Sequence, residues 1–344
     1  MEQQDWQDTD DTLFVGIDLG TSRSAIAASN GKRIWIDSYV GWPKDFVARK
    51  ALGQPVLFGE QALRHRLSLE LYRPLERGVI KEGTTRDQDA VMELIRHLIE
   101  CAGPTEGQPV HAVVGVPAES FKTNKLAIRR CLGNAVSALM VASEPFAVAY
   151  GLNLLDNALV IDIGAGTIDF CIMHGTMPGD ESQRSLLMAG DHLDKQLYDA
   201  LTERYPGTSL TLHLARQFKE RHSFVGEPAE PVQVEIPVRG RIVTHDITAE
   251  MRKTCESILP AIIETAVEMI ARFDPEYQNL IRRNIVLAGG GSQIRGLASC
   301  IERELGDYGP CSVRCVEDPL FAGADGSLAL ARDMPAEYWE KMQN

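Results

Sequence analysis

Hydrophobic residues are interrupted in the same way at two places in the chain. The stretch 159–170 reads Leu-Val-Ile-Asp-Ile-Gly-Ala-Gly-Thr-Ile-Asp-Phe, and residues 13–26 repeat its order of apolar run, Asp-x-Gly, hydroxyl residue and second apolar run. Two apolar runs around a short glycine turn predict a β-hairpin at each place. Because the pattern occurs twice, it also predicts two similar halves of the molecule.

The glycines of these turns favour a phosphate ligand. Residues without a side chain let backbone N–H groups turn outward and approach a ligand closely. A carboxylate beside bound phosphate repels it unless a divalent cation lies between them, so Asp162 indicates Mg²⁺ held through water. The alternative is an ordinary hairpin in which Asp162 favours the turn. Two such hairpins that face each other would hold a phosphate chain from both sides.

A third glycine motif lies near the C-terminal end of the chain. Residues 284–288 form an apolar run that leads into Gly289, Gly290 and Gly291, followed by a pattern typical of a helix start. Glycines there let a nucleoside lie against the backbone at the helix N-terminus. A flexible loop is the alternative, although such loops seldom follow so apolar a strand.

The remaining pattern predicts a mixture of strands and helices. Apolar runs predict strands at 25–29, 34–36, 110–117, 136–141, 232–238 and 242–247. Helical spacing predicts helices at about 60–69, 87–101, 120–132, 146–150, 189–201, 212–218 and 248–273. Asn30 and Gly31 predict a type I′ turn. Thr248 is expected to cap the last of these helices and Pro260 to kink it.

Other segments have simpler interpretations. Residues 1–12 are polar and acidic and predict a mobile tail. Trp42 and Phe46 are expected in a local core, with a subunit contact as the alternative. His97 has no partner at metal-ligand spacing and is interpreted as structural. Small residues at 321–330 predict a helix that packs closely against another.

Composition limits the possible functions. With 344 residues, 44% of them hydrophobic, the chain can form a large core in two lobes. A formal net charge of −13 argues against a nucleic-acid partner, which needs a basic face. The 7 cysteines are scattered and are expected to be reduced thiols in the cytosol. No apolar run approaches the roughly 18 residues of a membrane span, and the acidic N-terminus is unlike a signal peptide.

The three motifs, in this order, resemble those of the superfamily of actin, sugar kinases and heat-shock chaperone ATPases. The resemblance implies an α/β, actin-like (ribonuclease H-like) fold with two lobes. Each lobe would hold a mixed β-sheet flanked by helices, with a smaller subdomain on top. The first lobe would span 13–151, with its subdomain at about 40–80. The second would span 152–320, with its subdomain at about 191–247, and 321–344 would return to the first.

The same resemblance implies ATP or ADP with Mg²⁺ as cofactors and Asp18 and Asp162 as water-mediated metal ligands. Glu144 would orient the attacking water, although an acid that stabilises the start of a helix is the simpler alternative. Lys219 and Glu220 would contact adenine and ribose, and a surface ion pair is the alternative for these two residues. The implied cofactor contacts are Asp18, Gly20, Thr21 and Ser22; Gly164, Ala165, Gly166 and Thr167; Lys219 and Glu220; and Gly289, Gly290, Gly291, Ser292 and Ile294. Many relatives have two glycines where this chain has only Gly190, so direct phosphate contact is not expected there.

Within the superfamily, residues 141–151, 224–226 and 337–339 are similar to those of the bacterial actins that organise magnetosome chains. This likeness implies an ATPase that polymerises into dynamic cytoplasmic filaments along magnetosomes. Its partners would be further copies of itself and magnetosome-associated proteins, without nucleic acid or direct membrane insertion. A chaperone ATPase is the first alternative, but no peptide-binding domain follows. A small-molecule kinase is the second, but no acceptor pocket is identified. The pattern matches neither a P-loop nor a dinucleotide fingerprint.

Overall fold

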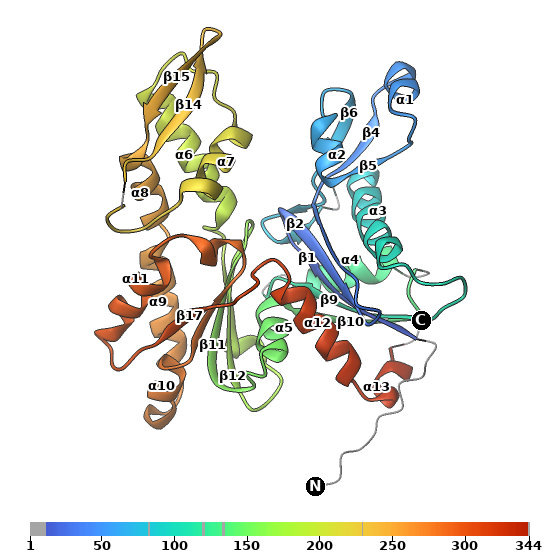
Figure 1. The fold of residues 1–344 in the computed structure, drawn as a ribbon. Coiled ribbons are helices and arrows are strands. Elements are labelled where there is room, and N and C mark those ends of the chain that lie inside the picture. The colour runs from blue at the N-terminus through green and yellow to red at the C-terminus, as the bar shows by residue number, and fades with distance from the viewer. Residues whose placement is uncertain (1–11, 82, 119–120, 133–134, 229, 343–344) are drawn as a thin grey trace. The chain divides into compact units, whose positions relative to one another are not determined.

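The computed structural model describes residues 12–81, 83–118, 121–132, 135–228 and 230–342. The chain divides into two compact units (Figure 1). Unit 1 contains residues 1–153 and 320–344, and unit 2 contains residues 154–319. The predicted tail at 1–12 lies outside the described residues except for residue 12.

Unit 1 is built on a five-stranded sheet with the order β10-β9-β1-β2-β3. β1 pairs antiparallel with β2, and β2 with β3, whereas β9 runs parallel to both β1 and β10. The strands are β1 (Leu13–Leu19), β2 (Arg23–Ala28), β3 (Arg33–Asp37), β9 (Val110–Val116) and β10 (Ala138–Ser143).

Unit 2 repeats this sheet strand for strand, in the order β13-β12-β11-β16-β17. β11, β12 and β13 form antiparallel pairs, and β16 runs parallel to β11 and β17. The strands are β11 (Asp156–Ile163), β12 (Ile168–His174), β13 (Gln183–Leu186), β16 (Ile285–Ala288) and β17 (Val313–Cys315). The two glycine hairpins therefore occupy equivalent places, β1–β2 and β11–β12, in two similar sheets.

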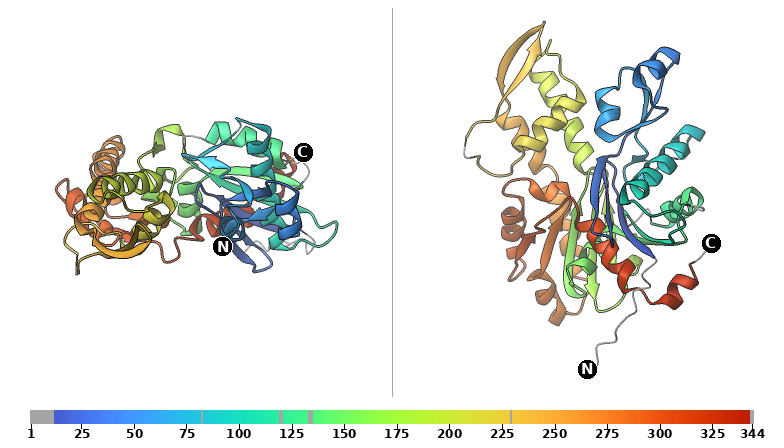
Figure 2. Two further views of the ribbon diagram at one scale, coloured as in Figure 1. Left: turned by 90° about the horizontal axis from the view of Figure 1, so that it is seen from above. Right: turned by 45° about the vertical axis from the view of Figure 1, so that its right-hand side comes forward.

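Helices cover both faces of the unit 1 sheet. Val15 and Ile17 of β1 belong to the hydrophobic core that includes helix α3, whereas a β-carbon on Gly16 would lie 2.1 Å from the backbone of α12. Alternate residues of a strand point to opposite faces, so α3 and α12 lie on opposite sides of the sheet (Figure 2). Outside its small subdomain, the helices of this unit are α3 (Thr85–Ala102), α4 (Phe121–Leu132), α5 (Glu144–Gly151), α12 (Ala322–Asp333) and α13 (Ala336–Glu340).

α5 and α12 pack through small residues, as the sequence predicts. A β-carbon on Gly326 of α12 would lie 1.9 Å from the carbonyl oxygen of Ala147 in α5. A β-carbon on Gly151 would in turn lie 2.7 Å from the Cα atom of Gly326. The two backbones can approach this closely only because both positions are glycine.

In unit 2 the sheet packs against helices that share one large hydrophobic core, with residues of β11, β12, β16, α6, α8, α9 and α11. A separate hairpin, β14 (Gln233–Val238) and β15 (Arg241–Asp246), forms a two-stranded sheet. The helices are α6 (Gly190–Arg204), α7 (Leu212–His222), α8 (Thr248–Glu256), α9 (Leu259–Ile270), α10 (Pro275–Arg282) and α11 (Leu297–Gly306).

The small subdomain of unit 1 differs from expectation. It contains β4 (Val40–Pro43), α1 (Phe46–Leu52), β5 (Leu57–Phe58), α2 (Gly59–Arg64) and β6 (Leu69–Tyr72), followed by the short pair β7 (Leu75–Glu76) and β8 (Val79–Ile80). The helix predicted at 60–69 therefore ends at Arg64, because Leu69 pairs with Pro43 as the start of a strand. Trp42 packs against the core as expected. Phe46 is 81% exposed, so its expected core role is wrong.

Three predicted local features are also wrong. Only Gly31 of the predicted type I′ turn has a positive φ, at 86°, and Ala28 N–H donates to Lys32 O. This closes a three-residue loop with glycine in the left-handed position. The predicted 248–273 helix is two helices, because Pro260 stands in the first turn of α9, where it needs no donor. Thr248 lies inside α8 and donates to the Asp246 carboxylate, so it is not the cap.

Candidate functional site

Asp18 occupies the second-to-last position of β1, beside Gly115 of β9. Burial raises the pKa of its carboxyl to about 7. A β-carbon on Gly323, at the start of α12, would lie 2.6 Å from the Asp18 Oδ2 atom. The fold therefore makes room for a carboxylate whose negative charge is disfavoured by its surroundings. A bound cation would favour the charged form.

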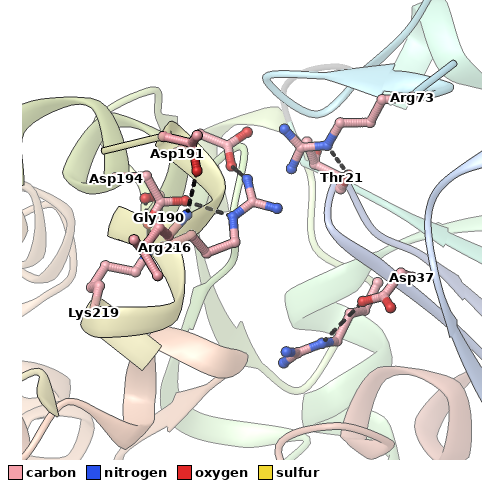
Figure 3. Close-up of polar contacts among 11 residues, drawn as sticks. Thr21, Asp37, Arg73, Gly190, Asp191, Asp194, Arg216 and Lys219 are labelled. Atoms are coloured by element: carbon pink, nitrogen blue, oxygen red, sulfur yellow. Dashed lines mark hydrogen bonds and ion pairs between the residues drawn. The ribbon is translucent and has the colours of Figure 1, made fainter. Parts of the chain in front are cut away.

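The carbonyl groups of the first glycine turn are held by the protein. Gly20 O accepts a hydrogen bond from Ser38 Oγ at 2.7 Å, and Ser22 O accepts one from Ser38 N at 2.9 Å. Thr21 O accepts a hydrogen bond from Arg73 Nε at 2.7 Å (Figure 3). Arg73 was not predicted, because no local pattern connects residue 73 to a turn 52 positions earlier. These contacts fix the turn in one conformation.

Glu144 begins α5 directly after β10 and is only 9% exposed. A β-carbon on Gly115 would lie 3.5 Å from Glu144 Cγ and 3.6 Å from the Oγ atom of Ser327 in α12. Gly115 also pairs with Asp18 on one side and Ala142 on the other. The two predicted acidic residues of unit 1 therefore lie at the same end of its sheet.

Asp162 holds the corresponding place in unit 2, second to last in β11, and is 9% exposed. A β-carbon on Gly289 would lie 2.3 Å from Asp162 Oδ1, and one on Gly291 would lie 2.1 Å from the Ile163 side chain. The structure thus brings the second and third predicted motifs together at the end of β11.

The second glycine turn is closed and then bonded to α6. Gly164 N–H donates to Thr167 O at 2.9 Å and closes the turn. Gly164 O accepts from Gly190 N at 3.1 Å, and Ala165 O accepts from Asp191 N at 2.7 Å. The N–H groups of Gly190 and Asp191 therefore donate within the protein.

Four charged residues of α6 and α7 form a network around the buried side chain of Asp194 (Figure 3). Arg216 donates from Nε to Asp194 at 2.8 Å and from Nη2 to Asp191 at 2.8 Å. Lys219 Nζ lies 2.6 Å from Asp194 Oδ1 and donates to Gly190 O at 2.7 Å. The side chain of Asp194 is 2% exposed. The ammonium of Lys219, predicted to contact adenine and ribose, is thus fixed against the start of α6.

Sequence reasoning missed Arg216, Asp191 and Asp194 as a group, although a signal existed. Asp191 and Asp194 are three residues apart on α6, and Arg216 and Lys219 are three apart on α7. Residues three apart share one face of a helix. Two such faces of opposite charge on neighbouring helices indicate a salt-bridge network.

The third motif has a different shape from the one expected. Gly289 has a φ of 71°, and a single 3₁₀ turn, Gly290–Gln293, follows. α11 begins only at Leu297, after Gly296, so the three glycines do not form a helix N-terminus. A β-carbon on Gly290 would meet no atom within 4 Å. The open position at Gly290 is where a ligand could lie against the backbone.

The carboxylates fit a metal held mainly by other ligands. In the described part of the chain, no three His, Cys, Asp or Glu side chains gather closely enough to hold a metal ion. Mg²⁺ commonly takes one or two carboxylates and completes its shell with water and substrate phosphates. Asp18 in unit 1 and Asp162 in unit 2 each have the chemistry for that role. Among the same residues, no helix is long and apolar enough to span a membrane.

Comparison with known proteins identifies relatives along nearly the whole chain. The family described as "MreB/Mbl protein" matches residues 12–337. "Actin-like protein MamK" of Paramagnetospirillum magneticum is 41% identical over 330 residues, covering 96% of this chain and 95% of the relative. The MamK of Magnetospirillum gryphiswaldense is 42% identical over 327 residues, covering 95% and 91%.

Solved structures agree with the sequence relatives. A MamK double helical filament superposes with a TM-score of 0.92 at 41% identity, covering 94% of this chain and 100% of that one. A non-polymerising MamK mutant bound to AMPPNP has a TM-score of 0.74 at 40% identity, covering 94% and 99%. AMPPNP is a non-hydrolysable analogue of ATP, so this relative has a nucleotide site.

Proposed function

The chain belongs to the MreB/Mbl family and has its actin-like fold, and from this premise we propose that it binds ATP and polymerises into cytoskeletal filaments. The observation that carries the proposal is the repeated hairpin, with Asp18 and Asp162 at equivalent positions of two equivalent sheets. Relatives that form filaments are similar over nearly the full length of this chain. The chaperone and kinase alternatives are not favoured, because these relatives are filament proteins.

We assign phosphate binding to the two glycine turns. In the first turn the carbonyl groups of Gly20, Thr21 and Ser22 accept hydrogen bonds from the protein. Residues 164–167 form the second turn, whose first two carbonyls accept hydrogen bonds from the start of α6. Carbonyl groups held in this way do not turn towards a phosphate. The backbone N–H groups of the two turns are therefore the favourable contacts for a phosphate. The turn 289–292 is assigned to the nucleoside.

Mg²⁺ would be held by Asp18 and Asp162, mainly through water. When bound, it would offset the negative charge that develops on the phosphoryl oxygens. An Asp162→Asn variant should bind nucleotide with a weaker dependence on Mg²⁺ concentration. Unchanged Mg²⁺ dependence would remove Asp162 from the metal site.

Hydrolysis is assigned to Glu144, which would accept a hydrogen bond from the attacking water and orient it. Its position after β10, at the same end of the sheet as Asp18, supports this role. Filaments of the relatives' kind would be dynamic if hydrolysis weakened the contacts between copies. By the likeness to MamK, we further propose that the filaments are cytoplasmic and position magnetosomes together with magnetosome-associated proteins.

The test combines sedimentation with phosphate release. Wild-type protein is given Mg-ATP, Mg-AMPPNP or no nucleotide, and pelleted protein and released phosphate are measured together. Pelleting that requires nucleotide, and that decays as phosphate appears with ATP but persists with AMPPNP, supports the proposal. Glu144→Ala should pellet normally with at least about a hundredfold less phosphate release, because alanine offers no acceptor to the attacking water. Exposed Glu317→Ala is the matched control. Phosphate release without a pellet would contradict filament formation.

A further inference from the structure

His97 and Cys101 bring a nitrogen and a sulfur atom together near the C-terminal end of α3. The two residues stand four positions apart on the helix and therefore share one face, which is the spacing of paired metal ligands on a helix. Cys101 Sγ lies 3.7 Å from His97 Nε2. The sequence interpretation that His97 has no partner at metal-ligand spacing overlooked Cys101.

The separation of these two atoms suits a zinc ion. Tetrahedral Zn²⁺ binds a thiolate sulfur at about 2.3 Å and an imidazole nitrogen at about 2.1 Å, which places the two ligand atoms about 3.6 Å apart. The observed distance of 3.7 Å is close to this value. Thiolate and imidazole also favour zinc over Mg²⁺ and Ca²⁺, which prefer oxygen ligands.

The ring of His97 is held in place by an aromatic neighbour. It stacks on Phe58, the last residue of β5, with 4.0 Å between the ring centroids and 4° between the ring planes. A metal ion approaches an imidazole nitrogen in the plane of the ring, so a partner on the ring face does not block it. A ligand that is oriented before binding loses little side-chain freedom when the metal binds.

The end of α3 favours a cation. The last turn of a helix carries a partial negative charge, and the last turn of α3 contains no basic residue. Glu100 lies in this turn beside Cys101 and is exposed. With Cys101 ionised, these negative groups outweigh the single positive charge of Lys32, which lies beside Gly103 at the same end. The carboxylate of Glu100 would supply a third ligand after rotation of its side chain.

The other described cysteines have different neighbours. Cys171 and Cys255 lie against methionine sulfur, and Cys300 lies against an arginine. Among the cysteines whose side chains the structure describes, Cys101 is the one in contact with a histidine. A zinc ion should therefore bind at Cys101 in preference to these other thiols.

We propose that His97 and Cys101 bind one Zn²⁺ ion, with Glu100 and water as its remaining ligands. When the zinc–sulfur bond forms, the Cys101 thiol releases its proton to solvent. The ion would join the last two turns of α3 and hold the His97 ring against Phe58. The site uses no residue assigned to ATP or Mg²⁺, so the inference does not depend on the proposed filament function.

Cobalt binding tests the site, because Co²⁺ adopts the zinc geometry and its bond to a thiolate absorbs in the near ultraviolet. Reduced, metal-free full-length protein is titrated with Co²⁺ in excess Mg²⁺, which occupies oxygen sites without competing for sulfur. The charge-transfer band should saturate at one equivalent of Co²⁺ and disappear when one equivalent of Zn²⁺ is added. Cys101→Ser should abolish the band. Cys315→Ser, which removes an exposed cysteine without a histidine contact, is the matched control and should keep it.

His97→Phe removes the nitrogen ligand and keeps an aromatic ring to stack on Phe58. Calorimetric titration should show Zn²⁺ binding weakened by more than about tenfold, since even the loss of a partner that only orients a ligand typically costs about 10–100-fold. Zn²⁺ should raise the melting temperature of wild type and of Cys315→Ser, but not that of His97→Phe or Cys101→Ser. Melting of each variant without metal shows whether it has folded.

Three outcomes would overturn the inference. A charge-transfer band that survives in Cys101→Ser, or that disappears in Cys315→Ser, would assign the metal to another thiol. Unchanged Zn²⁺ affinity in folded His97→Phe would remove the imidazole from the site. Absence of a saturable band in the wild type would show that the two side chains form only a hydrogen bond. Pelleting and phosphate release are not read in these experiments, so failure of the filament function would leave their results unchanged.

Discussion

Gly289 lies so close to Asp162 that a β-carbon on the glycine would stand 2.3 Å from the carboxylate oxygen Oδ1. Asp162 belongs to the second predicted motif and Gly289 is the first glycine of the third, 127 positions apart in the printed sequence. The contact explains why an apolar strand is followed here by glycine: β16 pairs with β11, and its continuation must pass the carboxylate. Space for the Asp162 side chain is therefore provided by a second motif.

Gly289→Ala should destabilise unit 2 and weaken nucleotide binding. The new methyl group would overlap Asp162, and the φ of 71° is unfavourable for alanine. Together these effects should lower the free energy of unfolding by about 2–4 kcal/mol. The measurement is urea unfolding with and without Mg-AMPPNP. Gly290→Ala is the control: its β-carbon would meet no atom within 4 Å, so only nucleotide affinity should fall. Normal affinity in Gly290→Ala would move the nucleoside site elsewhere.

The sequence was most informative where a pattern is local and repeated. The two hairpins and their equivalent carboxylates, Asp18 and Asp162, follow from alternating apolar runs and glycine turns, and the structure places them in equivalent sheets. The close packing of α5 on α12 was also readable from small residues. Long-range contacts were not readable. Arg73 contacts Thr21 from the connection between β6 and β7, and nothing in the sequence near either residue indicates that contact.

Exposure was also hard to predict from the sequence. Phe46 is apolar and lies in a short amphipathic segment, which favours a core position, yet Ala48 is the residue of α1 that is buried.

The break between α8 and α9 was not predictable either. It depends on which side chains before and after Pro260 pack into the core. Periodicity alone cannot distinguish a kinked helix from two helices.

Arg216→Ala should destabilise the protein far more than removal of an exposed arginine. The Asp194 side chain is 2% exposed and would keep only Lys219 as its charged partner. A buried carboxylate that loses one of two partners should lower the free energy of unfolding by about 2–4 kcal/mol. Arg33→Ala removes a pair with Asp325 whose side chains are both 44% exposed, and should cost less than about 1 kcal/mol. Equal urea midpoints for the two variants would contradict this account.

Gly326→Ala should prevent correct packing of α12 on α5. Its β-carbon would lie 1.9 Å from Ala147 O, and backbone on both sides leaves no flexible side chain to move. The cost should exceed about 3 kcal/mol, because one of the two helices must shift. Gly306→Ala, also in a helix, would meet no atom within 4 Å and should be neutral or slightly stabilising. Soluble yield and thermal melting of the two variants provide the measurement.

His111 should make the stability of unit 1 depend on pH. Its ring lies 4.7 Å from that of Trp339, centroid to centroid, and burial lowers the pKa of His111 below its ordinary value of 6.5. The folded state therefore holds the neutral ring, while the unfolded chain gains a proton near pH 6.5. Stability from this group is present above that pH and is lost as the pH falls below it, by up to about 1.4 kcal/mol per pH unit.

The variant His111→Phe keeps an aromatic ring against Trp339 but cannot titrate. Its free energy of unfolding should fall less than that of wild type between pH 7.5 and pH 5.5. The pKa values of His97 and His222 are also lowered by burial, so the wild-type slope contains their contributions. Only the difference between the two proteins reports on His111. Parallel stability curves would show that protonation of His111 is equally favourable in the folded and unfolded chain, and that its contact with Trp339 does not exclude the charged ring.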